Sequence, residues 1–327
     1  MLRPDIQEIV KNCKFNDRYE LSQRLINLWY PNHWVYWIDG QQDYLHITHK
    51  FRSKPGQYNH ILIAQTEEDW FYKYQLKGLR SQIQNDPAWT KRSVLLTNSA
   101  KDMAISRRYI RTIHKPGLLD LISYLPYTTQ NPKIDLEYHC AFMYSSPRKE
   151  RDEIADIVSS SLQYSAYRYE GVEKTQMYLP KSMYYGLPPD CPWIDIESDL
   201  DYMSKTAFNI VLETLNQKSA KTVSRFGPTL SEKTFKNMHL MRPALVFGGH
   251  NTRQYLRRLG FDTWDWFIDW SFDSEKNNDK AFQMYKTELH RLLNTPIEEL
   301  QKLITDNKKS LLHNRRHIFK LINNYLD

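Results

Sequence analysis

An adjacent acid and base, Glu232-Lys233, stand at the predicted start of a helix and are the residues best suited to chemistry. Ser231 is of a type preferred at a helix N-cap. Backbone N–H groups at a helix start favour an anion. A carboxylate there can accept hydrogen bonds from ribose hydroxyls, while the ammonium group and the helix end bind a diphosphate. Thr234 either adds a hydroxyl to this phosphate site or serves only the helix start.

The elements that would position this pair follow directly in the chain. Apolar residues recur at helical spacing: Phe235, Met238 and Met241. Pro243 ends that helix, and the apolar run at 244–247 has the length of a buried parallel strand. Gly248 and Gly249 then form a tight turn, or let a ligand approach the backbone closely, or both.

Two upstream segments carry further candidate ligands. Arg148 and Arg151 stand where the predicted strand 139–144 gives way to a helix, and guanidinium groups bind phosphate in bidentate fashion. Glu213 ends the predicted strand 208–213, and ligands of open α/β sheets bind beyond the carboxyl ends of strands. An exposed acid at a strand end is the alternative interpretation of Glu213.

These segments together resemble the donor-binding region of GT-B glycosyltransferases. The Ser-Glu-Lys helix, proline, strand and glycines of 231–249 resemble that region in fucosyltransferase-like enzymes and in glycosyltransferase-like proteins of tailed phages. The phage proteins also resemble this chain in a Gly-Phe-x-Thr-aromatic turn, here 260–264, and in a Ser-aromatic-Asp, here 271–273. The resemblance extends over roughly residues 139–275, less than half of the chain.

The resemblance implies an α/β fold of the GT-B type, with two Rossmann-like domains that face a cleft. It implies transfer of a sugar from a nucleotide-diphosphate donor to an acceptor hydroxyl, with the nucleotide sugar as co-substrate and without a metal or other cofactor. The acceptor suggested by the phage proteins is a hydroxymethylated base in double-stranded DNA. A glycan or a protein acceptor remains open.

Inverting transfer needs a general base for the acceptor hydroxyl, usually a carboxylate or histidine from the first domain. Asp39 follows the aromatic, β-branched run at 33–38, and Glu67 follows the apolar run at 61–64. Both carboxylates thus follow predicted strands, and we take Glu67 and Asp39 as the catalytic candidates. A retaining mechanism would not need such a base.

The pattern of strands and helices predicts three regions. Residues 1–130 form an acceptor-side α/β domain with strands at 33–39, 61–64 and 94–97, and the turn-rich segment 126–132 closes it. Residues 131–278 form the donor-binding domain, and 279–327 form a C-terminal helical region. Further elements are predicted with less regular patterns: helices in the first thirty residues, at 70–79 and from 100, a strand at 44–48 and an apolar segment at 118–124. Whether the terminal helix crosses back to the first domain stays open.

Composition excludes several classes of protein. With 41% hydrophobic and 13% aromatic residues the chain is globular, and no run of eighteen apolar residues predicts a membrane-spanning helix. The first residues lack the apolar core of a secretory signal, and Cys13, Cys140 and Cys191 are few and far apart. We therefore expect a reducing cytoplasm and no membrane partner. Acidic pairs occur at 195–197 and 199–201; the second has the Asp-x-Asp form of a metal site but is interpreted as helix capping, so no metal site is predicted. Asp269 and Asp273 are interpreted as caps or as acids that lock the fold.

A net charge of +7 and a pI near 9.0 permit a nucleic-acid partner without requiring one. Two alternatives to a glycosyltransferase therefore stay open. One is a non-catalytic binding protein on the same fold, such as a phage structural or host-inhibiting factor. The other is a nucleic-acid-processing enzyme without sugar chemistry, which would bind DNA with a steep salt dependence.

Overall fold

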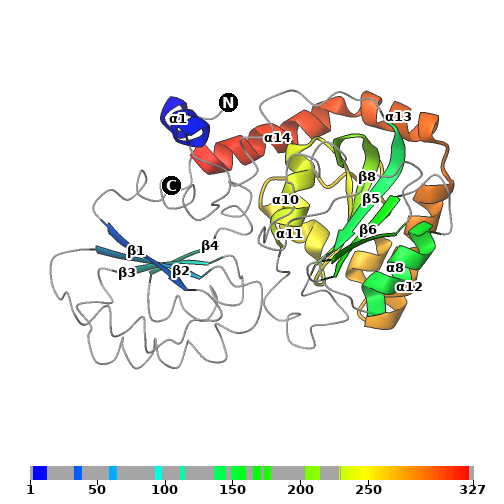
Figure 1. The fold of residues 1–327 in the computed structure, drawn as a ribbon, viewed down its shortest axis with the longest axis horizontal. Helices are drawn as coiled ribbons and strands as arrows, with labels where there is room; N and C mark the ends of the chain where they lie inside the picture. Colours follow the sequence, from blue (N-terminus) through cyan, green and yellow to red (C-terminus); the bar gives the residue numbers. More distant parts are fainter. Residues whose placement is uncertain are drawn as a thin grey trace.

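The computed structural model describes two parallel-strand sheets and the helices around the second (Figure 1). The described residues are 3–12, 33–38, 59–64, 93–97, 111–114, 136–144, 149–159, 165–170, 173–177, 203–213, 228 and 230–323. The predicted α/β class is confirmed. The predicted domain boundary at 126–132 and the predicted elements at 44–48, 70–79 and 118–124 lie outside the described residues.

The first sheet contains four parallel strands in chain order, β1-β2-β3-β4. The strands are β1 (His33–Ile38), β2 (Asn59–Ala64), β3 (Ser93–Thr97) and β4 (Arg111–His114). The three apolar strands were predicted from their β-branched and aromatic residues. The short β4 was missed, because a four-residue segment with arginine at one end and histidine at the other carries no apolar run.

The second sheet has the order β7-β6-β5-β8-β9. Its strands are β5 (Tyr138–Tyr144), β6 (Ser165–Glu170), β7 (Glu173–Met177), β8 (Thr206–Leu212) and β9 (Ala244–Phe247). All neighbours are parallel except β6 and β7, which form an antiparallel edge pair. From β5 the chain builds outward to β6 on one side, then to β8 and β9 on the other. The order of strands therefore reverses between β5 and β8.

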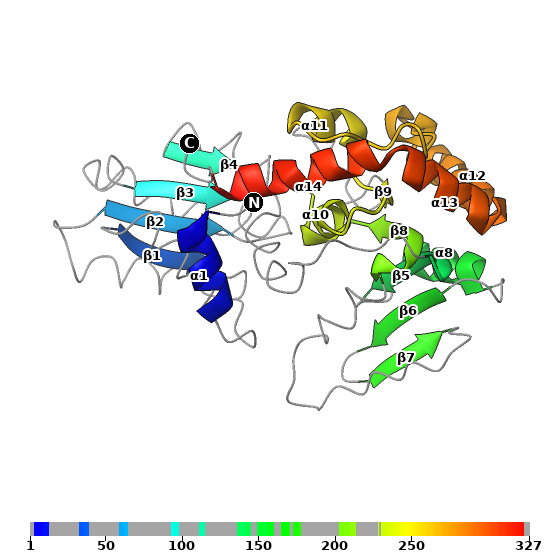
Figure 2. The ribbon, with the colours of Figure 1, turned by 90° about the horizontal axis from the view of Figure 1, so that it is seen from above.

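Helices cover both faces of the second sheet because right-handed connections that run in opposite directions leave their helices on opposite sides. Helix α8 (Lys149–Ser159) links β5 to β6 and contacts both strands. It also contacts α12 (Asn278–Asn294), which packs against β5 on the same side. Helix α10 (Glu232–His239) links β8 to β9 and packs against α14 (Lys308–Asn323). Figure 2 shows α8 and α10 beside different parts of the sheet.

The predicted C-terminal helices and β9 share the core of this region with β5, α8, β8 and α10. The predicted helical region from 279 is confirmed as α12, α13 (Ile297–Asp306) and α14, with Leu292, Leu300, Ile304 and Leu311 buried. Phe247 of β9 packs against the rings of Phe282 and Tyr285, at centroid distances of 5.2 and 5.0 Å. The Tyr285 hydroxyl donates to the Leu245 carbonyl (3.1 Å), which ties α12 to β9 without leaving a buried hydroxyl unsatisfied.

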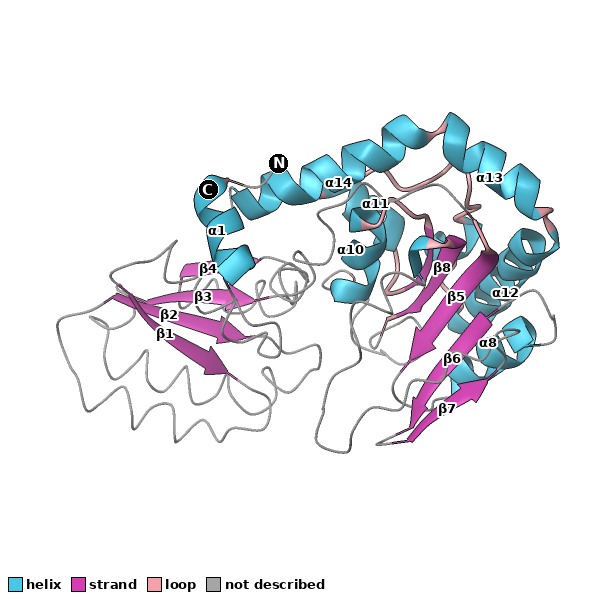
Figure 3. Ribbon diagram, turned by 45° about the horizontal axis from the view of Figure 1, so that its top comes forward, coloured by secondary structure: helices cyan, strands magenta, loops and turns pink. Residues whose placement is uncertain are grey.

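The end of α14 meets the start of the chain. Helix α1 (Pro4–Asn12) lies at the C-terminal end of α14, where the Arg3 backbone N–H donates to Asn323 Oδ1 (2.9 Å). Ile6 of α1 is fully buried in the same hydrophobic core as Ile322. Figure 3 shows α14 running from above the second sheet toward the first. None of the helices described is long and apolar enough to cross a lipid bilayer.

Candidate functional site

The candidate donor-site segments follow three adjacent parallel strands of the second sheet. Because β5, β8 and β9 are parallel neighbours, their carboxyl ends lie at one edge. The chain segment with Arg148 and Arg151 follows β5, Glu213 follows β8, and Gly248-Gly249 follows β9. The strand order reverses between β5 and β8, and such a reversal is where open α/β sheets bind their ligands.

The start of α10 is held by a buried carboxylate. Ser231 has the extended backbone of an N-cap residue, and its Oγ accepts from the Lys233 backbone N–H (3.3 Å). Glu213, only 2% exposed, accepts from the Ser231 backbone N–H (3.1 Å) and from the hydroxyls of Ser231 and Thr234 (2.6 Å each). The predicted N-cap is confirmed. The Thr234 hydroxyl, a candidate phosphate ligand, donates to Glu213, so its observed partner lies within the fold.

Burial dominates the electrostatics of this carboxylate. Removal from water raises the pKa of Glu213 above its ordinary value, while the ammonium group of Lys233 and the hydrogen bonds from Ser231 and Thr234 act in the opposite direction. Of the alternatives raised by the sequence, the exposed strand-end acid is wrong, because Glu213 is buried. Glu213 instead fastens the end of β8 to the start of α10.

A second set of buried hydrogen bonds holds the next turn of the same helix. Asn209 of β8 donates through Nδ2 to Asn237 Oδ1 (2.6 Å), and Asn237 donates through its own Nδ2 to the Lys233 carbonyl (2.8 Å). Thr206 completes this chain by donating to Asn209 Oδ1 (3.0 Å). Two separate polar ties therefore set both the position and the rotation of α10, and with them the place of Lys233, which is half-buried.

The turn after β9 is built by close packing. A Cβ on Gly248 would lie 2.6 Å from Thr252 Oγ1, in the first turn of α11 (Thr252–Arg258). The Thr252 hydroxyl in turn donates to the Gly249 carbonyl (2.7 Å). The structure thus supplies a packing reason for the glycine at 248: the helix start approaches too closely for any side chain.

The start of α11 is also capped by a distant acid. Asp273, in the 3-10 turn η4 (Ser271–Ser274), accepts from the backbone N–H groups of Thr252 (2.9 Å) and Arg253 (3.0 Å). Burial raises its pKa to about 6. The prediction that Asp273 is a cap is confirmed. Asp269, also predicted as a cap, accepts from the Ser271 backbone N–H (2.9 Å) at the start of the same turn.

Of the remaining predicted site residues, the structure describes the side chain only of Arg151. Arg151 lies in the first turn of α8 with a side chain only 5% exposed. Four further candidates lie outside the part of the chain that the structure describes: Arg148, Glu67, Asp39 and the side chain of Glu232. Among the residues described, no three histidine, cysteine, aspartate or glutamate side chains are grouped as metal ligands.

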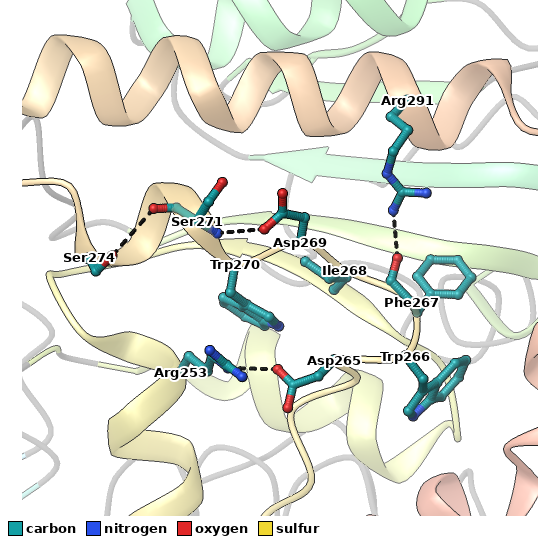
Figure 4. Close-up of a pocket in the computed structure, with 10 residues that line it drawn as sticks. All are labelled: Arg253, Asp265, Trp266, Phe267, Ile268, Asp269, Trp270, Ser271, Ser274 and Arg291. Atoms are coloured by element: carbon teal, nitrogen blue, oxygen red, sulfur yellow. Dashed lines mark hydrogen bonds and ion pairs between the residues drawn. The ribbon is translucent and has the colours of Figure 1, made fainter.

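A pocket of about 560 Å3 lies apart from the predicted residues, between α11, the 265–271 loop and α12 (Figure 4). Asp265 pairs with Arg253 (2.6 Å) and with Arg257, and these guanidinium groups outweigh burial and lower its pKa. Arg291 donates to the Phe267 carbonyl (2.7 Å) and pairs with Glu288. This pocket was not predicted from the sequence, because Arg291 of α12 and Arg253 of α11 meet the 265–271 loop only in the folded protein. Its charged groups already pair within the fold, so we assign it no ligand.

Comparisons of the chain with models of protein families, with curated proteins and with solved structures found no match. Its function is therefore inferred from the chemistry of its residues and from their placement in the fold.

Proposed function

We propose that this protein is a glycosyltransferase with a GT-B-like arrangement of two domains, which uses a nucleotide-diphosphate sugar as donor. The observation that carries the proposal is that two helices begin after adjacent parallel strands, at the reversal of strand order. Helix α8, with Arg151, begins after β5, and α10, with Lys233, begins after the neighbouring β8. Cationic side chains and helix N-termini at one strand edge suit a diphosphate.

The chemistry assigned to the donor side is electrostatic. Sugar transfer leaves a nucleoside diphosphate, so negative charge builds up on the leaving group as the glycosidic bond breaks. Lys233, Arg151 and Arg148 would stabilise that charge, and such stabilisation is commonly the largest catalytic term. Glu232 would orient the ribose, and the backbone at Gly248-Gly249 would border the donor. Glu213 acts through Lys233 as a positioning residue, because its hydrogen bonds to Ser231 and Thr234 hold the start of α10.

We assign binding of the acceptor to the first sheet. The last residues of β1 and β2, Ile38 and Ala64, pair with each other in parallel. Asp39 follows Ile38 directly and Glu67 comes three residues after Ala64, so the two candidate bases follow adjacent strand ends. One of them would accept the proton of the acceptor hydroxyl in an inverting transfer. A hydroxymethylated base in double-stranded DNA is the acceptor that we propose to test first.

Donor binding tests this proposal directly. Melting curves would be recorded with UDP-, GDP-, ADP- and CMP-linked sugars, because a ligand at about a hundredfold excess over Kd adds about 2.7 kcal/mol to stability. We expect one nucleotide to raise the melting temperature, and Lys233→Ala to abolish that rise. Lys302→Ala, on the exposed side of α13, is the matched control and should keep it. No rise with any donor, repeated with acceptor DNA present, would reject a donor site.

One observation favours a second candidate, a binding protein that has the fold but no sugar chemistry. Both helix starts after β8 and β9 already bind a carboxyl group of the protein itself, Glu213 on α10 and Asp273 on α11. A site filled from within leaves fewer backbone N–H groups for a phosphate. The double substitution Glu232→Ala with Lys233→Ala separates the two candidates. An enzyme would lose release of the nucleoside diphosphate, whereas a binding protein would keep its partner.

A further inference from the structure

The solvent-facing side of α14 carries only one kind of charge. The sixteen residues of this helix include no aspartate or glutamate. Five of its residues are exposed, and all of them are basic or histidine: Lys308, Lys309, His313, Arg316 and Lys320. The apolar residues face inward, with Leu311, Ile318 and Ile322 almost fully buried.

Four of the exposed residues form a continuous stripe. Lys309, His313, Arg316 and Lys320 are spaced by four, three and four residues, which places them on one side of a helix. With a rise of 1.5 Å per residue the stripe is about 17 Å long. We call Lys309, His313, Arg316 and Lys320 the basic stripe.

The neighbouring helices show that this is not the ordinary solvated surface of the protein. The exposed residues of α12 and α13 carry both signs of charge. On α12 they are Asp279, Lys280, Gln283, Thr287, His290, Arg291 and Asn294, and on α13 they are Glu298, Glu299, Lys302, Thr305 and Asp306. No lysine or arginine of the basic stripe pairs with a carboxylate within the described part of the chain. Like charges at this spacing repel each other, and an anionic partner would remove that repulsion.

Helix α11 adds positive charge beside the middle of the stripe. His313 donates through Nε2 to the Gly260 carbonyl (2.9 Å), and His317 donates to the Leu259 carbonyl (2.6 Å). These bonds bring the C-terminal end of α11, with exposed Arg258, against α14. Like α14, α11 contains no acidic residue.

We propose that the basic stripe binds the phosphate backbone of a double-stranded nucleic acid. Phosphates repeat along a duplex, so a row of lysine and arginine side chains can neutralise several of them and release their counterions. The stripe has no exposed phenylalanine, tyrosine or tryptophan to stack on the bases of a single strand. It has no exposed apolar residue to enter a lipid surface, which an amphipathic membrane helix requires. The surface lies on a different element from the donor site, so it does not depend on sugar transfer.

Fluorescence anisotropy with a labelled duplex of about 20 base pairs, at salt concentrations from about 50 to 200 mM, tests the proposal. The stripe variant is K309Q/R316Q/K320Q. The matched control K276Q/K280Q/K302Q removes the same number of charges from exposed lysines elsewhere. Because all six residues are exposed, both variants should melt at the temperature of the unchanged protein.

We expect the unchanged protein to bind the duplex, and the stripe variant to bind it roughly tenfold or more weakly. The slope of log K against log salt should fall by about 0.9 for each phosphate that is no longer neutralised, so by about 2.7 for three. The control variant should keep most of its affinity, and Lys233→Ala should bind as the unchanged protein does. Equal weakening in the two triple variants would overturn the proposal, since net charge alone would then explain binding. A preference for single strands, or binding to phosphatidylserine vesicles without binding to duplex, would overturn it as well.

Discussion

Glu213→Gln changes one atom at the junction of β8 and α10 and removes the charge of the buried carboxyl. Glutamine keeps the volume of glutamate, and its single carbonyl oxygen can still accept from the Ser231 backbone N–H and from the Thr234 hydroxyl. Its amide nitrogen cannot accept from the Ser231 hydroxyl, so that hydroxyl must turn away. When Glu213 is protonated, the substitution exchanges one neutral group for another. The variant should then be less stable by about 1 kcal/mol, the net contribution of one hydrogen bond.

The loss of stability caused by Glu213→Gln should depend on pH and should become smaller as the pH rises. Burial raises the pKa of Glu213 above its ordinary value of 4.5 in the folded state, so the folded protein binds this proton more tightly than the unfolded chain. The resulting stabilisation is fully present below about pH 4.5 and is lost as the pH rises through the raised pKa. Each unit of pKa difference corresponds to about 1.4 kcal/mol. Glutamine does not titrate, so the variant lacks this loss.

Urea unfolding followed by tryptophan fluorescence, at a series of pH values from about 4 to 8, measures the difference between the two proteins. We expect Glu213→Gln to be destabilising at the acid end and to become less so, or even stabilising, toward neutral pH. Glu299→Gln on the exposed side of α13 is the control and should differ little from the unchanged protein at any pH. A cost that grows with pH would refute the reasoning, because the three hydrogen bonds and Lys233 would then outweigh burial.

Two further substitutions probe the packing around α11. The pKa of Asp273 is raised to about 6 in the folded protein, which therefore binds this proton more tightly than the unfolded chain. The resulting stabilisation of the fold, on the order of 3 kcal/mol for two pKa units, is lost as the pH rises from about 4 to about 6. In urea unfolding at pH 4 and 7, Asp273→Asn should abolish that decline, and an unchanged decline would refute the assignment. Gly260→Ala should lower stability by about 1–3 kcal/mol, because φ is 91° and the new Cβ would lie 2.7 Å from His317 Nε2. Melting temperatures of the double variant with His317→Ala should recover only part of this loss, since the backbone strain remains; full recovery would show that the clash alone matters.

Where a signal is local in the chain, the sequence was sufficient. Ser231 as N-cap, the helix after it and the strand at 244–247 follow from residue type, period and the position of Pro243, all within a few residues. Strands β1, β2 and β3 were recognised in the same way. Strands β6 and β7 were missed, although they are joined by only Gly171-Val172, a two-residue link typical of hairpins. The polar and aromatic residues of β6 and the mostly polar residues of β7 lack the apolar run that marks a buried strand.

Partners that lie far apart in the chain were decided only by the tertiary structure. The sequence placed Glu213 at a strand end, and the parallel order of β8 and β9 then set α10 across that end, where its hydroxyls reach the carboxylate. Asp273 was predicted as a cap, but the helix that it caps begins 21 residues earlier at Thr252. The spacing of the basic residues of α14 places them on one side of a helix, yet only burial of its apolar residues in the core decided that this side faces solvent. Residue type and the spacing of apolar residues determine structure over about one helical turn. Burial and hydrogen bonding between distant residues depend instead on which elements the order of strands brings together.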